Sequence, residues 1–180
     1  MNKKDELINI ATKLFSEKGY SNTPLSKICQ KANISKGLIY HHYTSKDDLL
    51  REVYKKSIND VTQLIDNKNK NLSVNEEIKE FLEFFFTQLT TKKILFQFDL
   101  NVIIQPQTKN VLHDLIKEKS ILTLRLVNKV FKKLDSKNSM LLSNVFITEL
   151  EGVLLGYIIS GESYPLSDMK DSLIKKYMSL

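Results

Sequence analysis

Residues 23–46 read TPLSKICQKANISKGLIYHHYTSK, and the architecture of the N-terminal part follows from this stretch. Thr23 and Pro24 are typical of a helix start, because Thr caps helix N-termini and Pro suits the first helical position. Asn33 can adopt the left-handed backbone conformation of a tight turn. Ser35 can cap the short helix that follows. The stretch therefore predicts two short helices joined by a tight turn, which is the arrangement of a helix-turn-helix unit.

Helical spacing continues on both sides of this unit. Upstream, apolar residues recur three and four positions apart over 3–18, and Gly19 follows in the place of a C-terminal cap. Downstream, Ser45 can start a long helix, and Ser73 can start another whose capping box is completed by Glu76. Further apolar helical segments are expected at about 94–105, 108–134, 138–160 and 167–179.

The composition favours the same fold class. The 180 residues include only 5 Gly and 3 Pro, which is too few for the many turns of an all-β fold. We therefore expect an all-α chain of about nine helices. The expected domains are an N-terminal three-helix helix-turn-helix domain, residues 1–46, and a C-terminal helical domain, residues 47–180. The polar segment DNKNKNL, residues 66–72, is the best candidate for a junction along the chain.

Positive charge is concentrated near the N-terminus. The formal net charge is +6, and residues 1–56 hold 11 Lys and Arg against 6 Asp and Glu. Residues 57–180 hold 16 basic residues against 15 acidic ones. An excess of positive charge in one segment of an otherwise near-neutral chain is typical of a protein that binds DNA. The alternative is that this distribution of surface charge is accidental.

Several classes of protein are disfavoured. The single cysteine, Cys29, allows no internal disulfide and no cysteine-based zinc cluster, and it is expected to be a buried packing residue. The N-terminus lacks the apolar core of a signal peptide, and the longest strongly apolar run, 153–159, is too short to span a membrane. No catalytic motif is present, and the adjacent His41 and His42 lack metal-ligand spacing. We expect a cytoplasmic protein that is not an enzyme and has no cofactor, no metal and no membrane partner.

Three segments follow the pattern of a known family: ATKLFSEKGYSNT (11–23), ICQKANISKGLIYHHY (28–43) and TSKDDL (44–49). In these segments the chain resembles the TetR family of bacterial transcriptional regulators, over about residues 7–50 and without a gap. Asn33 stands where the family usually has Gly, and Tyr43 stands where it usually has Phe. Asn is the next best residue for the turn conformation, and Tyr keeps the core contact of Phe.

The resemblance implies which residues contact double-stranded operator DNA. Contacts to phosphates, which fix the register of the protein on DNA, are implied for Thr23, Ser35, Tyr40, His42 and Lys46. Contacts to base edges or thymine methyl groups are implied for Lys36, Gly37, Ile39 and His41.

The resemblance also suggests roles for the C-terminal domain in regulation and dimerisation. The aromatic cluster at 81–86 is either core or the lining of a cavity for a small apolar effector. The candidate lining residues are Phe81, Phe85, Phe96, Phe98, Ile103 and Tyr157, and Asp99 or Glu149 could face a cationic effector. The last two helices are expected to pair with a second subunit, where Gly152 and Gly156 would allow close approach. The candidate dimer residues are Leu150, Val153, Leu154, Leu173, Ile174 and Tyr177, and the alternative for each of them is packing within one chain.

Together these features predict a homodimeric, sequence-specific DNA-binding regulator. We expect a repressor that a small-molecule effector releases from a palindromic operator. The alternative from another class is a helical protein-interaction module whose DNA binding is secondary or non-specific.

Overall fold

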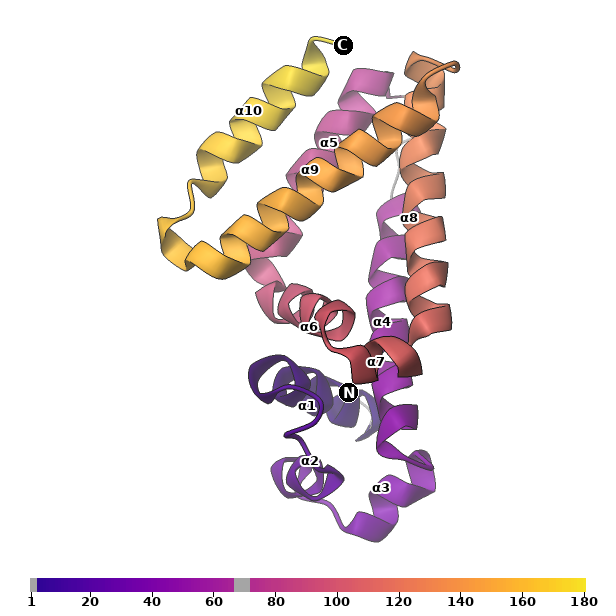
Figure 1. Cartoon of the computed structure of the whole chain (residues 1–180), viewed down its shortest axis with the longest axis vertical. Coiled ribbons are helices and arrows are strands. Elements are labelled where there is room, and N and C mark those ends of the chain that lie inside the picture. Colours follow the sequence, from indigo (N-terminus) through magenta and orange to yellow (C-terminus); the bar gives the residue numbers. More distant parts are fainter. Residues whose placement is uncertain (1–2, 67–71) are drawn as a thin grey trace. The chain divides into compact units, whose positions relative to one another are not determined.

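The structure is a computed structural model that describes residues 3–66 and 72–180 (Figure 1). The described residues contain ten α-helices and one short 3-10 helix and no strand, so the predicted all-α fold is confirmed. They form two compact units. The first comprises the described part of Met1–Val61 together with Ile94–Glu118, and the second comprises that of Thr62–Lys93 together with Lys119–Leu180. Most of the junction expected at 66–72 lies outside the described residues.

The first unit is built on the helix-turn-helix segment. It contains α1 (Lys3–Lys18), α2 (Leu25–Ala32), α3 (Lys36–His42) and the first part of α4 (Lys46–Asp66). It also contains nearly all of α6 (Lys93–Ile104), α7 (Pro106–Val111) and the start of α8 (His113–Leu134). The expected single helix over 108–134 is therefore wrong. Leu112 is fully buried in a non-helical conformation and separates α7 from α8.

The local signals for turns and caps are confirmed with one exception. Gly19 has a φ of 77° after α1, and Asn33 has a φ of 51° after α2. Ser35 caps α3, and its hydroxyl accepts a hydrogen bond of 3.2 Å from the Leu38 amide. The exception is the start of α2, where Pro24 rather than Thr23 occupies the N-cap position. The Thr23 hydroxyl instead donates to the Gly19 carbonyl at 2.8 Å, because it points back toward α1.

Residues far along the sequence complete the first unit. The Ser16 hydroxyl donates to the Ile94 carbonyl at 2.9 Å, and the Asn101 amide donates to the Ser16 carbonyl at 3.0 Å. The Phe98 ring is buried and stacks on Phe15 with centroids 6.5 Å apart. The compact unit that holds the helix-turn-helix segment thus extends well past residue 46. The functional boundary between residues 46 and 47 stays a prediction.

The second unit contains α5 (Val74–Thr91), most of α8, α9 (Ser139–Ser160), a 3-10 turn (Gly161–Ser163) and α10 (Leu166–Met178). Its core is aromatic. The Phe146 ring lies 4.8 Å from Tyr177, 5.4 Å from Phe131 and 5.5 Å from Phe81, measured between ring centroids. The capping box of Ser73 and Glu76 at the start of α5 is confirmed.

The two glycines of α9 have different surroundings. A Cβ on Gly156 would collide with the Tyr164 ring, so this glycine makes room for a side chain that follows the chain's own 3-10 turn. A Cβ on Gly152 would meet no atom within 4 Å, and Gly152 is exposed. The expected shared role of the pair in subunit contact is therefore corrected for Gly156, and Gly152 alone remains open to a second helix.

The α9 helix is unusually apolar. By length and composition alone, Ser139–Ser163 could cross a membrane: an 18-residue window has a mean hydropathy of 1.4, and 22% of that window is buried. The longest strongly apolar run in the sequence, residues 153–159, is too short to span a membrane. The apolar character of the helix, however, extends over the whole of Ser139–Ser163. An exposed apolar surface on a long helix is typical of an interaction site.

Candidate nucleic-acid interface

The α3 helix is attached to the first unit by one face. Ile39 has no exposed surface, and Tyr43, at the end of the helix, is 2% exposed. Because residues four apart lie on the same side of a helix, these two side chains form the inward face of α3. Ile39 was expected to contact bases, and this role is corrected: its side chain packs in the core of the unit.

The opposite face of α3 is open. Lys36, Gly37, Tyr40 and His41 are exposed, and they share one side of the helix by their spacing. Tyr40 is 56% exposed although it is aromatic. The neighbouring His42 is also exposed, with its ring 5.4 Å from that of His41. The structure therefore brings together on one surface most of the residues for which the sequence predicted DNA contacts.

The N-terminus of α3 is suited to an anion. Ser35 uses its hydroxyl to cap the helix, and it is exposed beside Lys36. Free backbone N–H groups and the positive end of the helix dipole favour negative charge at such an end. A helix of this size with a basic, hydrogen-bonding outer face can enter the major groove while its capped end lies at the phosphate backbone.

Gly37 provides an independent indication that a large partner approaches α3. A Cβ on Gly37 would meet only the Ser35 hydroxyl, at 3.8 Å, and Gly37 does not have a positive φ. Neither the packing nor the backbone of this chain therefore requires glycine here. Glycine is a poorer helix former than alanine, and its cost at Gly37, the second residue of α3, is at most the value of about 1 kcal/mol that holds in a helix interior. Close approach of another molecule would explain it.

Two further residues that were predicted to contact DNA phosphates, Thr23 and Lys46, use their side chains for contacts within the first unit. Thr23 has no exposed surface, and its hydroxyl is used within the unit, so the side chain is not displayed to a phosphate. The Lys46 ammonium donates to the Tyr20 carbonyl at 2.7 Å and lies 4.0 Å from the centre of the Tyr20 ring. Partial burial lowers the pKa of Lys46. Lys46 therefore fastens the start of α4 to the turn before α2.

Sequence reasoning missed the residues that fasten α8 to the first unit. The Arg51 guanidinium donates to both carboxylate oxygens of Asp114, at 2.8 and 2.6 Å, and to the Val111 carbonyl at 2.8 Å. This pairing lowers the pKa of Asp114. The two residues are 63 positions apart, so no local pattern could have indicated their contact.

The candidate effector-lining residues do not lie in one unit. Phe96, Phe98 and Ile103 belong to the first unit, whereas Phe81, Phe85 and Tyr157 belong to the second. Phe81 borders a void of about 10 Å³ in the second unit, together with Phe131 and Phe146. Asp99 accepts hydrogen bonds of 2.9 and 3.0 Å from the Ser57 hydroxyl, and Glu149 accepts one of 2.9 Å from Tyr177.

The candidate dimer residues mostly face the interior of the second unit. Leu150, Val153, Leu173 and Tyr177 are buried, and Leu154 and Ile174 are partly buried. A different set of α9 residues is exposed, which we call the α9 stripe: Leu141, Val145, Thr148, Gly152, Leu155 and Ile159. Successive members of the stripe are four and three positions apart in alternation. The buried residues of α9, which are Ser139, Ser143, Phe146, Leu150 and Val153, follow the same alternation, so the repeat of 3.5 residues alone does not distinguish the two faces.

A capped short helix that is held by its inner face and follows a tight αL turn defines the chain as a helix-turn-helix protein. Residues 7–53 match the family described as "Bacterial regulatory proteins, tetR family". The chain is similar to the biofilm operon icaADBC HTH-type negative transcriptional regulator IcaR of Staphylococcus epidermidis. The two are 39% identical over 84 residues, which cover 46% of this chain and 43% of that protein. The chain thus spans less than half the length of the curated relatives that it matches.

Solved structures extend the likeness over the whole fold. A transcriptional regulator from Aquifex aeolicus, described as of the TerR/AcrR family, has a TM-score of 0.77 and 25% identity, with 97% of each chain covered. FadR from Bacillus subtilis in complex with stearoyl-CoA has a TM-score of 0.81 with 97% of each chain covered, and at 16% identity this is a likeness of fold alone. The N-terminal segment of the chain, residues 7–53, is thus similar to the TetR family of transcriptional regulators, and the fold of the described residues is similar to that of solved transcriptional regulators.

We predict that Gly37→Ala separates stability from DNA binding. The added methyl group should leave the free energy of unfolding unchanged or raise it by up to about 1 kcal/mol, because alanine favours the helix. It should weaken DNA binding about tenfold or more, because the methyl group occupies space at the groove. Urea unfolding and a fluorescence DNA-binding titration measure the two effects. A variant that binds DNA as tightly as the unchanged chain would contradict the placement of Gly37 at the interface.

Proposed function

We propose that this chain is a sequence-specific DNA-binding repressor that acts as a homodimer in the bacterial cytoplasm. The observation that carries the proposal is the exposed face of α3, where Lys36, Gly37, Tyr40 and His41 follow the capped N-terminus of the helix. The description of IcaR as a negative transcriptional regulator supports repression. The basic charge of the N-terminal third favours association with DNA through its phosphates.

In the proposed complex, α3 lies in the major groove. Lys36 and His41 reach base edges there, because the groove displays a distinct donor and acceptor pattern for each base pair. Tyr40 and His42 donate to phosphates, and the N-terminus of α3 adds backbone N–H groups to this anchoring. Two copies related by a twofold axis would place two α3 helices about 34 Å apart, so the operator is expected to be palindromic.

The dimer is proposed to form through the α9 stripe. Leu141 is 66% exposed and Ile159 is 74% exposed, so the two ends of the stripe present large apolar surfaces. A repeat of 3.5 residues matches the seam of two helices that pack side by side. Gly152, in the middle of the stripe, allows the backbones to approach closely. A second copy therefore explains the exposed apolar surface of α9.

The effector is proposed to be a small apolar molecule that enters the second unit. The support is the aromatic core of that unit, where Phe81, Phe131 and Phe146 border a void of about 10 Å³ that would have to widen to hold an effector. The named complex of FadR with stearoyl-CoA is consistent with an apolar effector in this fold. Glu149 is bonded within the chain to Lys176 and Tyr177, which disfavours its use as a counter-charge for a cation. A tenfold loss of operator affinity requires about 1.4 kcal/mol of coupling between effector and DNA.

We predict that two neighbouring substitutions on α3 have different effects. Tyr40→Ala should weaken binding about tenfold to every sequence in a site library, because it removes a phosphate contact. His41→Ala should change the base preference at one position in each half-site, because it removes a base contact. Binding measured across the library distinguishes the two. If both variants lower the affinity uniformly, His41 does not read bases.

We predict that Leu155→Glu converts the dimer to a monomer, because two carboxylates would be buried against an apolar surface. Ile121→Glu on α8 is the matched control, since Ile121 is 40% exposed and Leu155 is 44% exposed. Sedimentation velocity should show a monomer for Leu155→Glu and a dimer for the control, with unchanged helical circular dichroism for both. A dimer that persists in Leu155→Glu would place the subunit contact elsewhere.

A further inference from the structure

The outward face of α3 includes one purely apolar side chain, that of Leu38. Successive side chains of an α-helix are rotated by about 100°, because one turn takes about 3.6 residues. The buried Ile39 and Tyr43 mark the inward direction. In the opposite direction His41 lies at the centre of the face, and Gly37 and Leu38 lie within about 60° on either side of it. Leu38 therefore belongs to the surface that is proposed to meet DNA.

Exposed apolar side chains are concentrated on this helix. Among the side chains that the structure describes between residues 3 and 59, only two large apolar ones are exposed, and both lie on α3. They are Tyr40, at 56%, and Leu38, at 39%. Tyr40 has a hydroxyl group that can bond to a phosphate, whereas Leu38 has no polar atom in its side chain. The exposure of Leu38 thus calls for an apolar partner.

The surroundings of Leu38 leave it open to a base edge. Its backbone amide donates to the Ser35 hydroxyl at 3.2 Å, so the cap of the helix fixes the backbone at this position. The preceding residue, Gly37, has no side chain, and a Cβ there would meet only the Ser35 hydroxyl, at 3.8 Å. A large group can therefore approach Leu38 beside Gly37 without a collision.

The chemistry of the major groove limits what Leu38 can contact there. Base edges in this groove display hydrogen-bond donors and acceptors, and the apolar group among them is the C5-methyl group of thymine. Leu38 cannot satisfy a donor or an acceptor, and covering one without a hydrogen bond is unfavourable. A thymine methyl group is consequently the partner that an apolar side chain on this face fits.

We propose that Leu38 is a specificity-determining residue that packs against the C5-methyl group of one thymine in each half-site. Ile39, for which the sequence predicted such an apolar contact, is buried, and Leu38 is the neighbouring apolar residue that α3 displays. The inference rests on the proposed function, because it requires α3 to lie in the major groove.

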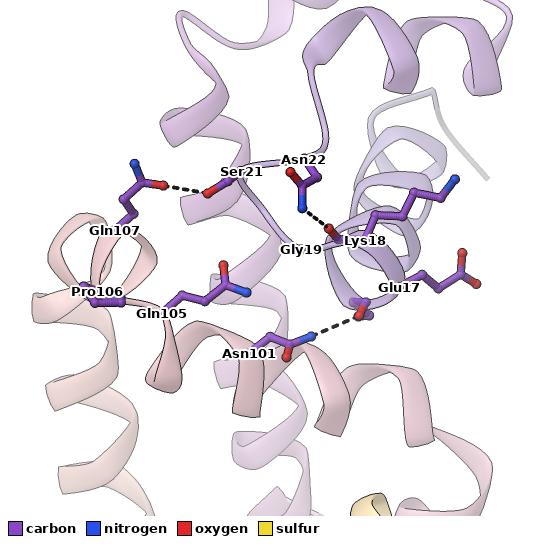
Figure 2. A pocket seen from close by; sticks show the side chains of 10 residues that line it. Glu17, Lys18, Gly19, Ser21, Asn22, Asn101, Gln105, Pro106 and Gln107 are labelled. Carbon is purple, nitrogen blue, oxygen red and sulfur yellow. Dashed lines mark hydrogen bonds between the residues drawn. The ribbon is translucent and has the colours of Figure 1, made fainter.

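A polar cavity of about 640 Å³ in the same compact unit provides a control position (Figure 2). It is lined by residues from 16–22, at the end of α1 and the turn that follows, and from 101–107, at the corner between α6 and α7. Figure 2 shows the Gln105 side chain reaching from this corner toward Gly19. It makes no hydrogen bond to the described residues, so Gln105→Ala should leave the unit folded.

The test compares thymine with deoxyuridine, which lacks only the C5-methyl group. The protein first selects its site from a random duplex library, and each thymine of that site is then replaced in turn. We expect one replacement in each half-site to weaken binding about fourfold, because one methyl-sized apolar group is no longer buried. Replacement in both half-sites should weaken binding about 15-fold. Fluorescence anisotropy titrations measure the affinities.

Variants assign the discrimination to Leu38. Leu38→Ala should bind the thymine and deoxyuridine sites equally, whereas Leu38→Met should keep the preference because it remains apolar. Ile121→Ala is the matched control for exposure, since Ile121 is 40% exposed, and Gln105→Ala is the control within the first unit. Both should keep the fourfold ratio. Each ratio compares two sites for one variant, so a general loss of affinity cancels, and thermal unfolding shows that each variant is folded.

Three results would overturn the inference while the proposed function stands. The selected half-site contains no thymine, the unchanged protein binds thymine and deoxyuridine equally at every position, or the discrimination persists in Leu38→Ala. The last result would assign the methyl contact to another residue. A folded protein that selects no site would contradict the proposed function and the inference together.

Discussion

The burial of Ile39 and Tyr43 is the constraint on which the candidate interface depends. These two side chains, four positions apart, fix one face of α3 against the first unit and leave the other face open. The outward direction of Lys36, Tyr40 and His41 follows from that attachment. Because α3 has only seven residues, it would not be stable as an isolated helix, and its orientation is set by this packing. The surface that is proposed to read DNA is thus determined by residues that do not contact DNA.

The first unit is assembled from parts that are distant in sequence. Ser16, Asn101 and Phe98 join α1 to α6, and Arg51 with Asp114 joins α4 to the start of α8. Both α4 and α8 also contain residues of the second unit. The two units are therefore joined by continuous helices. If the proposed effector acts on DNA binding, its effect on operator affinity would equal the difference in effector affinity between the two states.

The sequence was sufficient to predict features that depend on near neighbours. The αL turn at Asn33, the Ser35 cap and the Ser73 capping box involve residues within a few positions of one another. The four-residue spacing of Ile39 and Tyr43 already indicates that both side chains face inward. The sequence alone therefore provides a reason against a base contact by Ile39. The α9 helix is apolar on several sides, so its pattern could not show which side faces the chain's own core. The pairing of Arg51 with Asp114 and the polar cavity require the folded chain, because their residues are far apart in sequence.

The central claim is that α3 reads a DNA sequence, and one measurement tests it directly. The purified protein is incubated with fragmented DNA from its own genome, and the bound fragments are recovered and sequenced. The account predicts enrichment of one palindromic motif, with binding to a scrambled version weaker by about 10³-fold or more. A folded, dimeric protein that enriches no motif would contradict sequence-specific recognition by α3, and it would favour the helical interaction module instead.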